Sequence, residues 1–174
     1  MQGNSDKVNA LIQGEVIPRM VTVRQRFEAS KLEDPAAALR KQLERVRQTI
    51  RPGMTVAVTA GSRGIDHIDL LLRETVQFIR SAGGEPFLVP AMGSHGGAVA
   101  EGQLALLESF GITEETMGCP IRASMEVDQF ASLPDGTPVY IDRFAHAADG
   151  IVVVNRVKPH TGFRGPHESG LYKM

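Results

Sequence analysis

Residues 54–97 read MTVAVTAGSRGIDHIDLLLRETVQFIRSAGGEPFLVPAMGSHGG. A short apolar run opens into the glycine-flanked turn 61–64, and a second one, PFLVP, opens into the glycine-rich turn 93–97. Apolar residues between the two runs recur at helical spacing; they are Ile65, Ile68, Leu72, Val76 and Ile79. Alternating strand, tight loop and helix predicts a parallel sheet with right-handed crossovers. Both turns should then lie at the carboxyl edge of the sheet, where ligands of such folds bind.

Elements on either side extend this pattern. After Asp34-Pro35, a cap and first-turn pair, residues 36–50 have apolar positions at helical spacing and predict an amphipathic helix. Residues 98–111 predict a further helix after the second turn, and the apolar run 150–155, GIVVVN, predicts a final strand.

Extended structure is also expected outside the alternating core. The stretch Val16–Phe27 mixes β-branched residues with alternating charges and predicts a strand, broken or edged at Pro18. Short extended pieces around Pro134-Asp135-Gly136 predict a hairpin, which a helical turn at 143–147 should follow. We therefore expect an α/β, Rossmann-like domain spanning residues 1–174, with a mostly parallel sheet, helices on both faces and a small β-hairpin insertion.

Composition restricts the class of protein. A chain of 174 residues with 42% hydrophobic content can enclose one sizeable core. Its 19 basic and 20 acidic residues provide no positive excess for binding nucleic acid. It has neither an apolar run long enough to cross a bilayer nor the start of a signal peptide, so we expect no membrane association. The single cysteine, Cys119, fits a reducing, cytoplasmic location.

The first turn, Ala60–Gly64, can face an anion with its amide hydrogens and the following helix N-terminus. Ser62 and Arg63 lie within it, and the Arg63 guanidinium suits a carboxylate or phosphate. The alternative is that the glycines only make a tight turn and that Arg63 is solvated.

The second turn places an imidazole between glycines, in the order Gly93-Ser94-His95-Gly96-Gly97. Histidine titrates near neutral pH, and its small neighbours leave room for a ligand. A core histidine would sit among apolar residues, so a site role for His95 is favoured.

A third polar loop follows the final strand. Residues 158–170 concentrate cations, imidazoles and glycines, and we expect this loop to meet the other two at one sheet edge. His160, directly after the strand end, is the better candidate there, whereas His167 could belong to a solvated loop. His67 and His146 lie within helical patterns and are assigned to the surface or to packing.

Two other kinds of chemistry bear on these loops. His95, His160 and His167 could form a metal site, because neutral imidazole is a good ligand for nickel or zinc, although the spacing does not demand it. The chain has no GxxxxGK[ST] motif, and Gly61–Gly64 lacks the GxSxG pattern, so P-loop, kinase and hydrolase functions have no support.

Taken together, AGSRG, PAMGSHGG and NRVKPHTGFRGPHESGLYKM resemble the N-terminal domain of the nickel-dependent lactate racemase family and its uncharacterised relatives. The resemblance runs from about Val56 to the C-terminus. It implies an N-terminal α/β domain that, with a C-terminal domain, encloses a nickel-pincer nucleotide bound covalently to a lysine. In that family the cofactor accepts a hydride from the α-carbon of a hydroxy acid.

The resemblance also implies roles for individual residues. Arg63 resembles the arginine that orients a substrate or cofactor anion, and Lys173 resembles the lysine that tethers the pincer. His95 and His160 resemble the two histidines that take the hydroxyl proton and return it, one for each enantiomer. Further residues of the same motifs are expected to bind substrate or cofactor: Ser62, Gly93, Ser94, Gly96 and Lys158.

This chain departs from the family pattern in two respects. The histidine that completes nickel coordination lies, in the family, beyond the tether, so we expect no complete metal site here. His160 and Lys173 are thirteen residues apart, a longer spacing that indicates a divergent branch.

We therefore expect a truncated form, the N-terminal domain of an α-hydroxy-acid racemase or epimerase, an isomerase that is inactive without its C-terminal domain. Its partners would be a small hydroxy acid and that missing domain, and homo-oligomerisation stays open. The alternatives are a non-catalytic anion-binding module and an interaction domain that needs a C-terminal partner.

Overall fold

The computed structural model describes residues 10, 11, 13, 19–62, 64–160, 162 and 164–170. The chain divides into two units, residues 1–31 and 32–174. In the first unit, residues 19–31 have exposed side chains and form neither helix nor strand. The strand predicted over Val16–Phe27 is therefore wrong for residues 19–27, and positions 16–18 lie outside the described residues. Alternation alone does not make a strand, because a strand also needs a neighbouring backbone to complete its hydrogen bonds.

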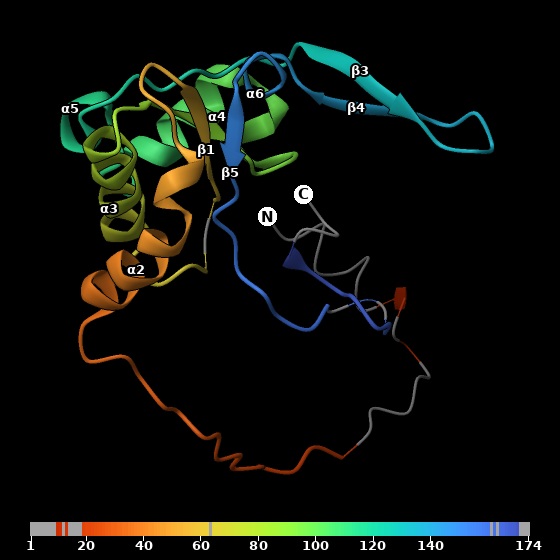
Figure 1. The fold of residues 1–174 in the computed structure, drawn as a ribbon. Coiled ribbons are helices and arrows are strands. Elements are labelled where there is room, and N and C mark those ends of the chain that lie inside the picture. The colour runs from red at the N-terminus through yellow and green to blue at the C-terminus, as the bar shows by residue number, and fades with distance from the viewer. Residues whose placement is uncertain are drawn as a thin grey trace. The chain divides into compact units, whose positions relative to one another are not determined.

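Three parallel strands form the sheet of the second unit (Figure 1). They are β1 (Thr55–Ala60), β2 (Glu85–Pro90) and β5 (Gly150–Val152), in the order β2-β1-β5. The pairing of β1 with β2 is in register from Thr55 opposite Glu85 to Ala60 opposite Pro90. An isolated parallel bridge from Leu88 to Ile121 extends the sheet beyond β2. The parallel sheet predicted from the alternating pattern is thus confirmed, although β5 ends earlier than the predicted strand 150–155.

Helical segments precede and connect the strands. They are α2 (Pro35–Leu43), η1 (Glu44–Thr49), α3 (Ile68–Ser81), η2 (His95–Ala98), α4 (Ala100–Glu108), α5 (Glu114–Met117) and α6 (Arg143–His146). Asp34 caps α2 as predicted, because its carboxylate accepts a hydrogen bond from the Ala37 amide at 2.9 Å and Pro35 begins the helix. The helix predicted over 36–50 ends as the tighter 3-10 helix η1. Among the described residues no helix has the length and apolar character needed to cross a membrane.

Both faces of the sheet are packed. Val56 and Val58 of β1 belong to a buried cluster with residues of α3, α4 and α5, whereas the intervening Ala57 packs in a cluster with Ala145 of α6. Successive side chains of a strand point to opposite faces, so helical residues cover both sides. The largest fully buried side chains are Leu72, Ile79, Leu88, Leu107 and Ile112.

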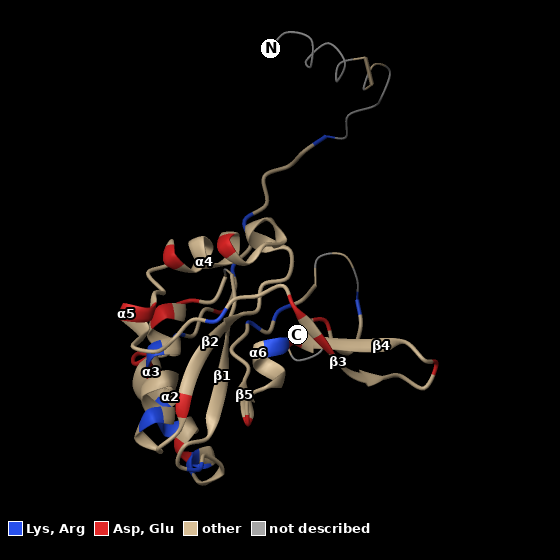
Figure 2. Cartoon of the chain, turned by 90° about the horizontal axis from the view of Figure 1, so that it is seen from above, with Lys and Arg blue, Asp and Glu red and all other residues tan. Residues whose placement is uncertain are grey.

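The predicted hairpin is present and extends away from the sheet (Figure 1). Strands β3 (Val127–Ser132) and β4 (Pro138–Asp142) pair antiparallel around a turn in which Gly136 has a φ of +86°. At its base, Arg143 of α6 forms an ion pair with Glu126 at 2.6 Å. Charges of both signs are spread over the second unit, with acidic residues on α4 and α5 and basic residues on α2 (Figure 2).

The packing of Leu88 predicts a large stability effect. Leu88→Ala should lower the free energy of unfolding by about 2–5 kcal/mol, because the Leu88 side chain on β2 is fully buried in the core and the change leaves a cavity. The matched variant Leu104→Ala, at a side chain that is 37% exposed, should lose clearly less. Chemical denaturation of both variants measures the difference, and equal losses would contradict this account of the core.

Candidate functional site

Three loops leave the sheet at its carboxyl edge. Because β1 and β2 are parallel and in register, the chain continues from Ala60 and from Pro90 at the same edge, and the Ala91 amide donates to the Ala60 carbonyl at 2.8 Å. β5 is also parallel to β1, and the hydroxyl of Thr59 accepts a hydrogen bond from the amide of Val154 at 2.9 Å. The three strands therefore end at one edge, as predicted, and the three loops start there, while the convergence of residues 158–170 on the two glycine-rich turns stays a prediction. β2 and β5 flank β1, so the edge also contains a topological switch point, the usual ligand position in such sheets.

Ser62 and His95 join the first two loops. The Ser62 hydroxyl, in a side chain that is 8% exposed, makes a short hydrogen bond with Nδ1 of the half-buried His95. Within the described part of the chain, His95 Nε2 has no hydrogen-bond partner. Nε2 is therefore the ring nitrogen with which His95 can exchange a proton with a ligand.

Helix α4 holds the backbone of the His95 loop. The buried side chain of Gln103 donates from Nε2 to the Gly93 carbonyl at 2.9 Å. Gly96 and Gly102 meet backbone to backbone, and a Cβ added to Gly102 would lie 1.9 Å from the Gly96 oxygen. Gly96 has a φ of +67°, so the loop needs glycine there for both its conformation and its close approach.

The other predicted members of this loop have different surroundings. Gly93 also adopts a positive φ, of 61°, and Ser94 is exposed and makes no capping hydrogen bond to η2. Ala98 has a φ of 57°, a left-handed conformation that is uncommon for residues other than glycine. Backbone strain of this kind clusters at functional sites.

A carboxylate organises the third loop. Glu168 accepts a hydrogen bond from the His160 amide at 2.7 Å with Oε2 and one from the Gly165 amide at 3.0 Å with Oε1. The hydroxyl of Ser169 accepts from the amide of Lys158 at 2.7 Å. Lys158 and His160, both predicted as site residues, thus lie at the start of a braced turn.

The His160 ring takes part in the same turn. Its Nδ1 accepts a hydrogen bond from the Gly162 amide at 3.0 Å. The Arg164 guanidinium donates to the His160 carbonyl. Arg63 and Lys173, the predicted anion-binding and tethering residues, lie outside the described residues.

The structure adds two residues that the sequence analysis missed. Arg156, after β5, donates from Nη1 to the Gly64 carbonyl at 2.7 Å and so ties the chain that leaves β5 to the first turn. The sequence could have indicated Arg156, because it is the first cation after a buried strand, as Arg63 is after β1. Gln103 gave no such signal, because a polar residue in a helix usually faces solvent.

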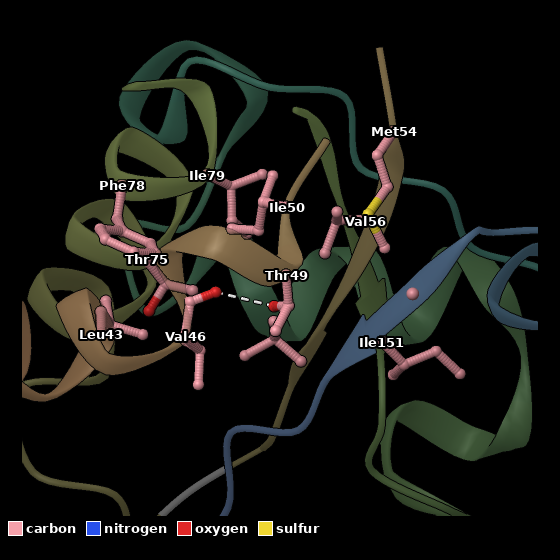
Figure 3. Close-up of a pocket in the computed structure, with 12 residues that line it drawn as sticks. Leu43, Val46, Thr49, Ile50, Met54, Val56, Thr75, Phe78, Ile79 and Ile151 are labelled. Atoms are coloured by element: carbon pink, nitrogen blue, oxygen red, sulfur yellow. Dashed lines mark hydrogen bonds between the residues drawn. The ribbon is translucent and has the colours of Figure 1, made fainter. Parts of the chain in front are cut away.

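An apolar cavity lies away from these loops. It has a volume of about 150 Å³ and is lined at the amino-terminal half of β1 and β5 by Met54, Val56 and Gly150, with α2, η1 and α3 around it (Figure 3). No titratable side chain lines it, so it offers no acid–base chemistry.

Neither metal-binding side chains nor comparison with known proteins assigns a function to these loops. Among the described residues no three His, Cys, Asp or Glu side chains converge as they would around a metal ion. No protein-family model, curated protein or solved structure matches the chain significantly.

The glycine contact predicts an unusual helix variant. Alanine in place of a helical glycine normally stabilises by about 1 kcal/mol, but Gly102→Ala should destabilise, because its Cβ would collide with the Gly96 carbonyl. We expect a loss of about 1–3 kcal/mol, as for overpacking, with displaced His95 ring resonances. Thermal unfolding and NMR measure both effects, and the exposed neighbour Glu101→Ala is the control. A stabilised Gly102→Ala with unchanged His95 signals would refute the contact.

The Glu168 brace predicts a pH dependence. Hydrogen bonds from the Gly165 amide and then the His160 amide lower the pKa of the Glu168 carboxyl. Since the pKa is lower in the folded turn than the value of about 4.3 in an unfolded chain, the stabilisation is complete above about pH 4.3 and is lost as pH falls through the folded-state pKa. Amide chemical shifts of His160 and Gly165 should therefore move together in an acid titration. In Glu168→Gln that shared transition should disappear, and its persistence would assign it to another carboxyl.

Proposed function

We propose that this chain is the N-terminal, Rossmann-like part of an α-hydroxy-acid racemase or epimerase in which His95 exchanges a proton with the substrate hydroxyl. The observation that carries the proposal is the hydrogen bond between Ser62 and His95 at the carboxyl edge of the sheet. The strand order supports the Rossmann-like assignment, since the segment at Ile121, β2, β1 and β5 follow one another as the third, second, first and fourth strands of that fold do.

The chemistry requires a base and a hydride acceptor. Oxidising the hydroxy acid breaks the O–H bond, whose proton goes to His95 Nε2, and the α-carbon C–H bond, whose hydride leaves with its electron pair as the C=O bond forms. Return of the hydride to the other face of the planar carbonyl, with reprotonation of the oxygen, inverts the centre. An imidazole suits the proton step because its pKa lies near neutrality.

The described residues do not by themselves fit a nickel centre, because no three metal-binding side chains converge among them. A lysine-tethered nickel-pincer nucleotide would supply the hydride acceptor, as the family resemblance implies. Lys173 and a C-terminal domain would have to hold it, and the part assigned to the described residues is therefore the proton transfer at His95.

A carboxylate substrate would also need a cation. Arg156 supports this requirement, because one guanidinium nitrogen is anchored on Gly64, two residues beyond Ser62. The same observation favours the second candidate function, an anion-binding module without catalysis. The two candidates differ in whether His95 is needed for chemistry or only lies beside the bound anion.

The racemase proposal predicts a specific dependence on His95. The longest native form, produced with nickel and the pincer-biosynthesis proteins, should interconvert the enantiomers of a hydroxy acid such as lactate, measured by chiral chromatography. His95→Gln should slow this by about 10²–10⁴-fold, the usual contribution of a general acid–base. His67→Gln, at an exposed histidine before α3, should leave the rate unchanged.

The cofactor and the binding of lactate distinguish the two candidate functions. Intact-mass and peptide analysis of the same protein should find a cofactor-sized adduct on Lys173. An unmodified Lys173 with no racemisation, together with lactate binding that survives His95→Gln but falls in Arg63→Ala and Arg156→Ala, would favour the anion-binding module.

A further inference from the structure

We infer that the two histidines are not interchangeable: the backbone holds neutral His160 with its proton on Nε2, whereas Ser62 allows His95 to carry its proton on either ring nitrogen. The catalytic meaning of this difference rests on the proposed function. The positions of the protons do not, because they follow from hydrogen bonds within the fold.

Nδ1 of His160 is a hydrogen-bond acceptor. The Gly162 amide lies 3.0 Å from that nitrogen, and a backbone N–H can only donate. Nδ1 must therefore present its lone pair. A neutral imidazole carries one proton, which is then on Nε2.

Glu168 keeps the Gly162 amide in that position. Its two carboxylate oxygens accept from the amides of His160 and Gly165, which lie on either side of Gly162 in the turn. Both bonds lower the pKa of the Glu168 carboxyl, so this acceptor stays ionised near neutral pH. Glu168 thus acts as a positioning residue for the His160 ring.

The surroundings of His95 do not fix which ring nitrogen carries the proton. Its Nδ1 meets the Ser62 hydroxyl, which can rotate to donate a proton or to accept one. Gln103 braces the loop through the Gly93 carbonyl and does not contact the imidazole through this bond. His95 can therefore change tautomer without losing its partner.

The difference in tautomer gives His95 and His160 different roles in proton transfer. Neutral His95, with its proton on Nδ1 facing Ser62, has a lone pair on Nε2 and can take a hydroxyl proton to become imidazolium. Neutral His160 presents Nε2–H, a hydrogen-bond donor. To act as a base at Nε2 it must first move its proton to Nδ1 and give up the bond from Gly162. His95 is therefore the better proton acceptor, and His160 is suited to donate to an oxygen.

The test reads the tautomers directly. Histidine-labelled 174-residue chain, without substrate or cofactor, is measured by long-range ¹H–¹⁵N NMR at about pH 8.5, well above the ordinary histidine pKa of about 6.5. We expect His160 as a single tautomer with its proton on Nε2. Ser62→Ala should change the tautomer ratio of His95 and leave His160 as it was. A wild-type His160 with its proton on Nδ1, or with both tautomers mixed, would overturn the inference.

Variants separate this effect from a loss of folding. Glu168→Gln replaces one accepting oxygen with a donating amide group and should give His160 mixed tautomers, while resonances of β1 and β2 stay in place. Glu115→Gln, at an exposed position of α5, should change neither histidine. Should Glu168→Gln fail to fold, Gly162→Pro removes the amide donor itself and should give the same mixture. An unchanged His160 in the folded variant would refute the brace.

The outcome is independent of the proposed reaction. Absence of racemisation together with the expected tautomers would reject the racemase function and keep this inference. Racemisation by a protein whose His160 carries its proton on Nδ1 would do the reverse.

Discussion

The parallel hydrogen-bonded ladder between β1 and β2 governs how the site is assembled. Its register, from Thr55 opposite Glu85 to Ala60 opposite Pro90, makes both strands end at the same level. The two glycine-rich loops then start side by side, and Ser62 can reach His95 across thirty-three positions of sequence. A parallel pair also requires a crossover, and α3 supplies it while covering one face of the core.

The candidate site is built from backbone interactions as much as from side chains. The glycine contact between Gly96 and Gly102 brings the His95 loop against α4, and Gln103 fixes the loop carbonyl from the same helix. In the third loop one carboxylate, Glu168, holds two amides. Such supporting contacts lower the cost of orienting a catalytic group, because the group is already positioned before a ligand arrives.

The same contacts explain why two histidines in similar glycine-rich loops can differ in chemistry. The Ser62 hydroxyl can donate to His95 Nδ1 or accept from it, so the His95 proton can be on either ring nitrogen. The Gly162 amide can only donate to His160 Nδ1, so the proton of neutral His160 is on Nε2. The proposed racemase function places proton transfer at His95, and the inferred tautomer of His160 makes that histidine the poorer base at Nε2. Arg156 adds a cation beside these loops, which fits a carboxylate substrate.

Local patterns in the chain predicted the strands of the second unit and the helices α2, α3, α4 and α6, because helical spacing, buried strand runs and turn residues act over a few neighbours, whereas the short helix α5 was not predicted. The cap at Asp34, the hairpin around Gly136 and the shared edge of the two glycine-rich turns all follow from such patterns. The pairing of Ser62 with His95 and of Arg156 with Gly64 emerged only from the folded chain, because each contact joins residues far apart in sequence. The folded chain also shows that residues 19–27 form no strand, since a β-pattern becomes a strand only where another backbone lies beside it.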